Sequence, residues 1–176
     1  MPEKRSSPGK RYLYTIFDTP YGYSGIVKTL KGLYKVILPQ KSKEETLKRI
    51  KSKLSGELVK DEFFCLSSSK KLTDYFSGKP ARFNEPIDFS GVSEFDKSVW
   101  IAAGKIPKGE VRSYGFIAKS IGNPKAKRAV GRALSRNRIP VIVPCHRVVR
   151  KNGDIGGFAS GAQMKRLLLK IEGRVL

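Results

Sequence analysis

The sequence predicts two domains, an α/β domain over residues 1–91 followed by a mostly α-helical, winged helix-turn-helix domain over residues 92–176. Three observations predict this fold class. Strand-like segments rich in Tyr, Ile and Val lie early in the chain, two short helices joined by a tight turn lie in its second half, and a hairpin signal follows them. A length of 176 residues suits one large domain or two small ones.

The first half begins with three predicted strands. Residues 11–17, 24–30 and 34–38 are rich in β-branched and aromatic residues. Turn-forming residues separate them, at Asp18–Gly22 and at Lys31-Gly32. This spacing predicts a small antiparallel sheet.

Helical patterns and a linker complete the first domain. Residues 43–54 place apolar side chains at helical spacing, which predicts an amphipathic helix. A second helix is predicted over about 68–77, ending at Gly78. Residues 79–91 read as a linker with one extended segment, so the domain boundary is expected near residue 91.

The second half opens with a helix over 93–106, for which Ser93 is a suitable N-cap. Ser113 can cap a short helix over 114–121. Gly122 suits the end of that helix, and Asn123-Pro124 suits the N-cap and first turn of a new helix that runs to about Asn137. Two short helices joined in this way predict a helix-turn-helix.

The second of these helices has two different faces. At 100° per residue, Arg128, Arg132 and Arg136 form one stripe. The opposite face carries small and apolar residues, namely Ala126, Val130, Ala133 and Leu134. A solvated charged face is the usual explanation for such a stripe, but the helix-turn-helix context favours contact with DNA.

The chain ends with an extended segment, a turn and a helix. Residues 140–149 are apolar and predicted to be extended, and Lys151-Asn-Gly153 is a hairpin signal, which together predict the wing. A glycine-rich loop over 156–161 follows. The last helix is predicted to place four residues on its core face, namely Met164, Leu167, Leu168 and Ile171.

Charge is the strongest compositional signal. The chain carries 36 Lys and Arg against 15 Asp and Glu, for a net charge of +21. Residues 92–176 hold 18 basic and 5 acidic residues, a net +13, whereas residues 1–91 hold 18 and 10, a net +8. A basic surface of this kind favours nucleic acid as the partner, although a merely basic protein is the plainer alternative.

Cysteine and histidine usage limits the remaining classes. The two cysteines, Cys65 and Cys145, and the single histidine, His146, cannot build a disulfide framework or a zinc site of the usual spacing. We expect no cofactor and no metal. No apolar run approaches the ~20 residues of a membrane span, and the N-terminus lacks a secretory signal, so we expect a cytoplasmic protein, or a nuclear one in a eukaryote.

Cys145 and His146 form the candidate reactive pair. A thiol becomes nucleophilic when a base or a cation stabilises its thiolate. On an extended segment neighbouring side chains point to opposite faces, so a bridging water would have to carry a proton from Cys145 to His146. Glu172 is a candidate to orient the imidazole. For a cysteine taken alone, a buried structural role is the commoner one, and Cys65 is interpreted in that way.

The segment Ile139-Pro-Val-Ile-Val-Pro-Cys-His-Arg-Val-Val149 resembles the active-site segment of the O6-alkylguanine-DNA alkyltransferases, also called methylated-DNA–protein-cysteine methyltransferases. The resemblance runs from Lys108-Gly-Glu-Val-Arg-Ser-Tyr114 through Gly122-Asn-Pro-Lys and Arg128-Ala-Val-Gly131 to Glu172-Gly173, nearly all of residues 93–173. In the first half, the resemblance is limited to the order of the predicted elements. It implies that this half is a ribonuclease H-like supporting domain.

The resemblance implies one reaction and a set of roles. The alkyl group of O6-alkylguanine, and of O4-alkylthymine, passes once and irreversibly from a flipped nucleotide to Cys145. His146 takes the thiol proton through water, Glu172 holds His146, and Tyr114 donates a proton to guanine N3. Asn137 links the helix-turn-helix to the active-site turn.

The same resemblance implies the surfaces that meet DNA. Arg128 fills the gap left by the flipped base, and further contacts are expected from Ser113, Ala129, Arg132 and Arg136. The substrate pocket is expected to be lined by Leu134, Pro140, Val148, Phe158 and Ala159. Phe158-Ala159-Ser160 departs from the family's usual loop, where a tyrosine is common, so the range of alkyl groups accepted is open.

Three other functions compete with this one. A non-enzymatic damage-binding relative would have replaced Cys145. A winged-helix transcription factor would explain the charge but not the Pro-Cys-His-Arg segment. A cysteine hydrolase would place its base at hydrogen-bond distance from the thiol and would turn over repeatedly. We therefore expect a monomeric, single-turnover alkyltransferase acting on double-stranded DNA.

Overall fold

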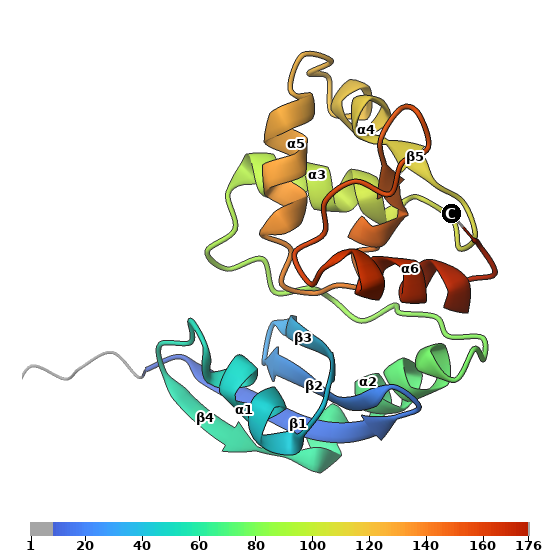
Figure 1. Cartoon of the computed structure of the whole chain (residues 1–176). Coiled ribbons are helices and arrows are strands. Elements are labelled where there is room, and N and C mark those ends of the chain that lie inside the picture. Colours follow the sequence, from blue (N-terminus) through green and yellow to red (C-terminus); the bar gives the residue numbers. More distant parts are fainter. Residues whose placement is uncertain (1–8, 176) are drawn as a thin grey trace, which may run out of the picture. The chain divides into compact units, whose positions relative to one another are not determined.

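A computed structural model describes residues 9–175 (Figure 1). The chain divides into two compact units. Of the described residues, one unit contains 9–74 and 81–88, and the other contains 75–80 and 89–175. Within the described range, no helix has the length and apolar character required to cross a bilayer.

The first unit is built on a four-stranded sheet in the order β3-β2-β1-β4. Its strands are β1 (Arg11–Thr19), β2 (Gly22–Thr29), β3 (Gly32–Gln40) and β4 (Glu57–Lys60). The first three pair antiparallel and confirm the predicted strands, while β4 pairs in parallel with β1. Strand β4 was not predicted, because its four residues carry charges at both ends and show no run of β-branched residues.

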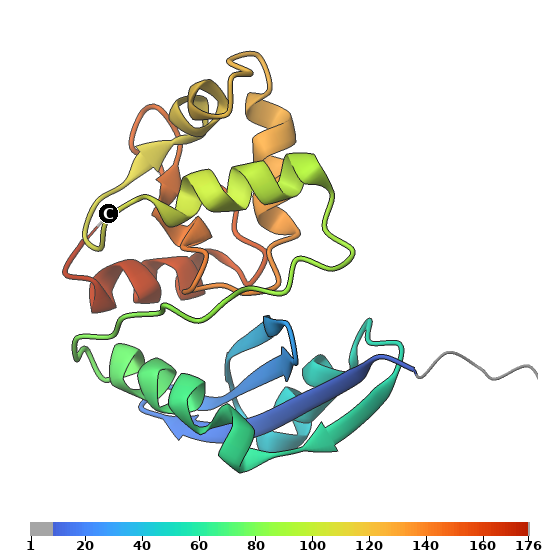
Figure 2. The ribbon, with the colours of Figure 1, turned by 180° about the vertical axis from the view of Figure 1, so that it is seen from behind.

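Two helices, α1 (Lys43–Lys51) and α2 (Glu62–Phe76), lie on opposite faces of this sheet (Figures 1 and 2). Helix α1 approaches strand β2 closely at Gly25, where a Cβ would lie 2.8 Å from Ile50 Cδ1. Helix α2 begins earlier than the predicted residue 68 because the Asp61 carboxylate accepts a hydrogen bond from Phe64 N at 2.8 Å.

The second unit is mostly helical, with α3 (Glu94–Gly104), α4 (Tyr114–Ser120), α5 (Lys127–Ser135) and α6 (Ala162–Ile171). Ser93 caps α3 as predicted, by accepting a hydrogen bond from Asp96 N. The buried Trp100 on α3 donates its indole N–H to Ala133 O on α5 at 2.9 Å. This contact fixes the two helices against each other.

The helix-turn pair is confirmed at α4 and corrected at α5. Ser113 caps α4, and Gly122 leaves the helix with φ of 74°, as predicted. Helix α5, however, begins at Lys127 with Ala126 as its N-cap, so Asn123 is not an N-cap. Residues 123–126 form a separate turn in which Ala126 N donates to Asn123 O at 3.0 Å.

The predicted wing hairpin is wrong. Lys151–Gly153 does form a turn, closed by a hydrogen bond from Arg150 N to Asp154 O at 2.9 Å. The strand before it, β6 (Val148–Val149), pairs in parallel with β5 (Arg112–Ser113), and residues 155–161 form no strand. The glycines that follow the turn explain why no second strand forms there.

Candidate active site

The thiol of Cys145 lies on a single turn of 3₁₀ helix, η1 (Cys145–Arg147). Two backbone hydrogen bonds close this turn, from Cys145 N to Val143 O at 2.8 Å and from Arg147 N to Pro144 O at 2.9 Å. The prediction that residues 140–149 are extended is therefore wrong here. Pro144 has no N–H to offer to a strand, which favours a turn at this point. On this turn Cys145 and His146 do not follow the alternation of a strand, so the expected placement on opposite faces does not apply.

Asn137 connects the end of α5 to this turn. Its amide nitrogen donates to Val143 O at 2.9 Å and to Cys145 Sγ at 3.1 Å, and its Oδ1 accepts from Ile139 N at 3.0 Å. One side chain thus binds the turn at three points. It fixes the position of the sulfur and offers it an N–H donor that strengthens as negative charge develops.

The turn held by Asn137 is conformationally strained. Val141 has a φ of 75°, a left-handed conformation that is rare for a β-branched residue. Such a residue costs on the order of 1–3 kcal/mol and persists only where the surrounding contacts fix it. A hydrogen bond from Val143 N to Ile139 O at 2.9 Å and the amide of Asn137 supply those contacts.

The thiol of Cys145 is neutral at rest. The residue is 6% exposed, and burial raises the pKa of the thiol, while the hydrogen bond from Asn137 and the charge of Lys165 act in the opposite direction. A neutral thiol is a weak nucleophile, so its proton has to leave during the reaction. The site therefore requires a proton acceptor.

His146 and Glu172 supply a buried base and its orienting carboxylate. His146 Nε2 lies 2.8 Å from Glu172 Oε1, and both side chains are fully buried. Burial lowers the pKa of His146, and Glu172 opposes this shift. His146 Nδ1 has no hydrogen-bond partner among the described residues. Because an ionised carboxylate only accepts hydrogen bonds, Nε2 carries the proton and Nδ1 presents a lone pair.

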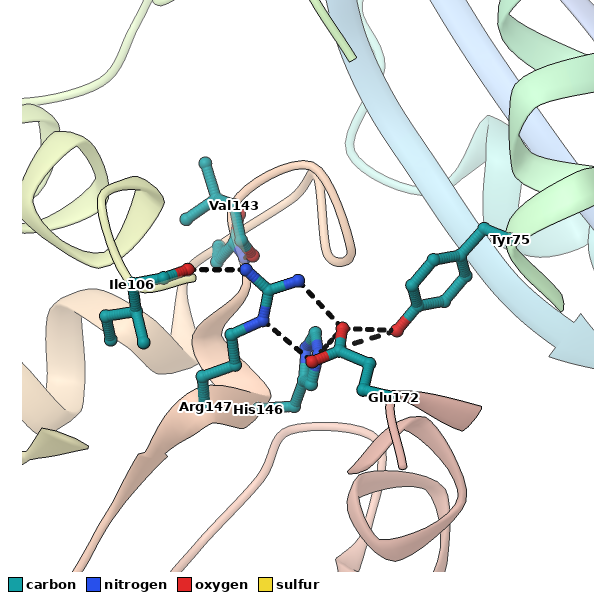
Figure 3. Close-up of polar contacts among 7 residues, drawn as sticks. Tyr75, Ile106, Val143, His146, Arg147 and Glu172 are labelled. Atoms are coloured by element: carbon teal, nitrogen blue, oxygen red, sulfur yellow. Dashed lines mark hydrogen bonds and ion pairs between the residues drawn. The ribbon is translucent and has the colours of Figure 1, made fainter. Parts of the chain in front are cut away.

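Arg147 keeps this carboxylate ionised (Figure 3). Its Nε donates to Glu172 Oε2 and its Nη2 to Glu172 Oε1, each at 2.8 Å, while Nη1 donates to Ile106 O at 2.5 Å. Burial alone raises the pKa of Glu172, but the hydrogen bonds from His146 and Arg147 outweigh burial and hold that pKa well below its usual range. Arg147 was part of the quoted segment, yet the sequence analysis gave it no role.

Lys165 is a buried cation that the sequence analysis missed. It is fully buried on α6, where Leu168 and Leu169 are also buried. The predicted core face placed Met164 and Ile171 inward instead, and both are only half-buried. Lys165 Nζ donates to Val148 O at 2.6 Å, and burial lowers the pKa of the amine to about 8. No sequence pattern indicates this, because a lysine at this helix position is ordinarily exposed.

The depressed pKa of Lys165 predicts a stability that rises with pH. Between about pH 8 and 10.4 the unfolded chain binds more protons at this residue than the folded protein, so the free energy of unfolding increases with pH. Relative to Lys165→Met, which cannot titrate, the wild type should gain roughly 2–4 kcal/mol over this range. Urea unfolding of both proteins at pH 7.5 and 10 measures the difference. Parallel pH dependences would contradict it.

A cavity of about 660 Å³ is lined in part by Cys145, and its volume is within the usual range of ligand pockets. It lies among α5, the start of α4 and the loop after β6, and its lining residues include Tyr114, Arg128, Arg132, Leu134, Cys145, Phe158 and Ala159. Two predicted lining residues are corrected. Pro140 and Val148 are buried and do not line it, because they belong to the packed turn and to β6.

Tyr114, the first residue of α4, presents its phenol to this cavity. Its Oη donates to Gly157 O at 3.4 Å. A Cβ at Gly156 would lie 3.2 Å from Tyr114 Oη, so a glycine at this position leaves room for the phenol. Burial raises the pKa of Tyr114, so the phenol stays protonated and can act as a donor. Ser113, predicted to meet DNA, uses its Oγ to accept from Phe116 N as the N-cap.

The arginine stripe of α5 is divided by its contacts. Arg128 and Arg132 are exposed, and Ala129 beside them is half-buried. Arg136 donates from Nε and Nη2 to the Asp96 carboxylate at 2.7 and 2.6 Å, a bidentate ion pair. The predicted DNA contact of Arg136 therefore has to compete with Asp96.

The second cysteine is unsuited to the same chemistry. Cys65 on α2 is fully buried, and burial raises the pKa of its thiol to about 12. In the part of the chain that the structure describes, no group of three His, Cys, Asp or Glu side chains is placed to hold a metal ion. Cys145 is thus the cysteine that lines a cavity of substrate size.

Two family models match the chain. The model for the "6-O-methylguanine DNA methyltransferase, ribonuclease-like domain" matches residues 12–89, and the model for the "6-O-methylguanine DNA methyltransferase, DNA binding domain" matches residues 94–174.

Individual relatives match over nearly their whole length. The chain is 44% identical over 160 residues to the methylated-DNA–protein-cysteine methyltransferase of Methanosarcina acetivorans, covering 91% of this chain and 97% of the relative. It is 39% identical over 150 residues to the inducible enzyme of that name from Bacillus subtilis, covering 85% and 83%. Among solved structures, Mycobacterium tuberculosis OGT in complex with DNA has a TM-score of 0.74 at 35% identity, covering 92% of each chain.

Proposed function

The chain belongs to the 6-O-methylguanine DNA methyltransferase family, and from this premise we propose that it repairs DNA by transferring the alkyl group of O6-alkylguanine to Cys145. One observation carries the assignment of the acceptor. Cys145 lines a cavity of about 660 Å³, and its Sγ accepts a hydrogen bond from Asn137. The next residue is the buried His146, whose Nδ1 has no hydrogen-bond partner among the described residues.

The transfer is a displacement at the alkyl carbon. A C–S bond forms to Cys145 as the C–O6 bond breaks, and the electron pair of that bond remains on guanine. The thiol proton passes through one water molecule to His146 Nδ1, the nitrogen left as an acceptor by the hydrogen bond to Glu172. Tyr114 donates a proton to guanine N3, so the guanine that is displaced from the alkyl group is neutral. The proton accepted by His146 then returns through solvent to Tyr114, and the net transfer is one proton from the thiol to guanine. The product is a thioether and repaired DNA.

Asn137 and Glu172 favour the charges that develop during this step. The N–H of Asn137, 3.1 Å from Sγ, stabilises the thiolate as the proton leaves. Glu172 stabilises the imidazolium that forms. The C–S bond of a thioether is chemically stable, so each molecule acts once.

Access to the lesion requires the nucleotide to leave the duplex, since O6 is not reachable inside the stack. We assign α5 as the helix that meets double-stranded DNA, with α4 as its helix-turn-helix partner. Small residues on it, Ala129 and Gly131, allow close approach, and Arg128 fills the gap left by the flipped base. All groups assigned here come from one chain, which fits action as a monomer.

The breadth of the substrate depends on the cavity wall. Phe158 and Ala159 line it, and a phenyl ring provides an apolar surface without the hydroxyl of a tyrosine. Methyl groups and larger alkyl groups of O6-alkylguanine fit this description, and O4-alkylthymine offers the same alkyl–oxygen bond.

Replacing Arg132 by glutamine is expected to weaken binding to duplex DNA about three- to tenfold, equally for different sequences, and to reduce the slope of log affinity against log salt by about 1. The exposed guanidinium of Arg132 borders the cavity and has no ion-pair partner among the described side chains. Fluorescence anisotropy at several salt concentrations measures both effects. Lys48→Gln on α1 makes the same change in net charge on the other unit, so equal effects of the two variants would contradict a specific role of α5.

The proposed function is tested by stoichiometry. The protein is incubated with an excess of duplex DNA that contains O6-methylguanine, and the methyl groups removed per protein molecule are counted over time. We expect a plateau at one. Continued turnover would indicate a hydrolase, and binding without any removal would indicate a damage-binding protein.

A further inference from the structure

Tyr75 brings a phenolic hydroxyl to the buried base. It lies near the end of α2, in the stretch 75–80 that belongs to the second unit, and it is 3% exposed. Its Oη donates to Glu172 Oε1 at 2.8 Å and lies 3.5 Å from His146 Nε2 (Figure 3). The alkyl-transfer step described above gives Tyr75 no role.

The donors around Glu172 determine which way each proton points. Oε1 is contacted by Tyr75 Oη, His146 Nε2 and Arg147 Nη2, and Oε2 is contacted by Arg147 Nε. An ionised carboxylate cannot donate, so each of these groups donates to it. The phenolic proton of Tyr75 is therefore directed to Glu172, and the imidazole proton stays on Nε2.

Four ionisable groups influence whether His146 is protonated. Glu172, at the end of α6, favours a protonated imidazole. Arg147, on the same 3₁₀ turn as His146, and Lys165 on α6 disfavour a protonated imidazole. Cys145 is the group that gives up its proton. Tyr75 adds no charge, but its hydrogen bond takes up part of the negative charge on Oε1, the oxygen that also binds His146.

We propose that Tyr75 is a positioning residue for alkyl transfer: its hydroxyl fixes the Glu172 carboxylate and thereby holds His146 neutral, protonated at Nε2, with Nδ1 free to accept a proton. The expected effect on alkyl transfer rests on the proposed function. The expected effect on the protonation of His146 rests on the contacts of Tyr75 alone. Without the hydroxyl, Glu172 binds an imidazolium more strongly, and a larger fraction of His146 is already protonated before the thiol can transfer its proton.

The single histidine of the chain gives a direct measurement. In ¹⁵N-labelled, tag-free protein without DNA, the imidazole resonances belong to His146 alone. For the wild type we expect the Nε2-protonated tautomer. For Tyr75→Phe we expect the titration midpoint of His146 to rise by about half a pH unit or more, since one donor to the partner carboxylate has been removed.

The same change should appear in the reaction. The single-turnover rate of methyl transfer from O6-methylguanine DNA is measured from pH 5 to 9. In Tyr75→Phe the acid limb should move to higher pH by the same amount as the midpoint in the NMR titration, with a plateau rate no more than about tenfold lower. Tyr12→Phe removes a hydroxyl from a tyrosine that is 2% exposed in the first unit, and it should leave both profiles unchanged.

Several results would overturn the proposal. One is an unchanged His146 titration in Tyr75→Phe, even if the rate falls, since a role in packing alone predicts that result. Another is an Nδ1-protonated tautomer in the wild type, a result that does not require any variant to fold. If the wild type transfers no methyl group but His146 behaves as expected in the NMR titration, the proposed function fails while the positioning by Tyr75 stands.

Discussion

Replacing Cys145 by serine is expected to abolish alkyl transfer while the affinity for duplex DNA stays within about twofold, because the site loses its nucleophile and keeps its shape. A serine hydroxyl has a far higher pKa than a thiol, and His146 cannot deprotonate it at neutral pH. Asn137 can still donate to the smaller Oγ, so the turn that it holds should persist. Single-turnover transfer and anisotropy measure the two properties separately.

Cys65→Ala is the matched control for this variant. Cys65 is fully buried in the first unit, so its loss should lower stability modestly and leave transfer intact. Transfer that survives in Cys145→Ser would place the nucleophile elsewhere. Loss of both transfer and DNA binding would instead indicate that the variant does not fold.

Glu172→Gln should produce the second large effect, a loss of about 10²–10⁴-fold in the transfer rate together with about 3–5 kcal/mol of stability. The amide cannot stabilise an imidazolium as the carboxylate does. It also leaves Arg147 without its charge partner. This is costly because the side chain of Arg147 is only 12% exposed. Single-turnover kinetics and urea unfolding measure these effects.

A double variant separates the two contributions of Glu172. In Glu172→Gln/Arg147→Met the unpaired cation is gone, so part of the lost stability should return while the rate stays low. The pH dependence gives a further check. The folded pKa of Glu172 lies below its unfolded value, so the wild type loses this stabilisation as the pH falls below about 4. Residue 172 does not titrate in the Glu172→Gln variant, so that variant should not show this loss of stability at low pH. In the double variant, recovery of the transfer rate would contradict the role of the Glu172 carboxylate.

Local patterns in the sequence predicted the elements that depend on local physics. The three β-branched segments formed β1 to β3, and Ser93 and Ser113 capped the helices that follow them. These features depend on residues that are neighbours in sequence. The predicted start of α5 was wrong because Asn123 and Pro124 belong to a separate turn. Asn and Pro are favoured in turns as well as at the start of a helix.

The site was predicted only where a motif named its residues. Cys145, His146 and Glu172 were singled out, and the structure brings His146 and Glu172 within hydrogen-bond distance. Tyr75 and Lys165 were missed because burial of a polar side chain is decided by partners far away in sequence. Tyr75 meets Glu172 across 97 positions, and no periodicity carries that information.

Errors at the turn that carries the thiol have a similar origin. An apolar run over 140–149 predicts a strand, but the turn depends on Pro144, on the left-handed Val141 and on the side chain of Asn137. The predicted core face of α6 was also partly wrong. Lys165 occupies a buried position, where its amine donates a hydrogen bond to Val148 O. In both cases a polar side chain, Asn137 or Lys165, hydrogen-bonds backbone groups that the local pattern does not reveal.

The central claim is that the sulfur of Cys145 accepts the alkyl group. Peptide mapping by mass spectrometry, after exposure of the protein to duplex DNA with O6-methylguanine, tests it most directly. We predict a gain of about 14 Da, because a methyl group replaces the thiol hydrogen, on the peptide that contains Cys145 and none on the peptide that contains Cys65. A Cys145 peptide of unchanged mass alongside repaired DNA would contradict the claim.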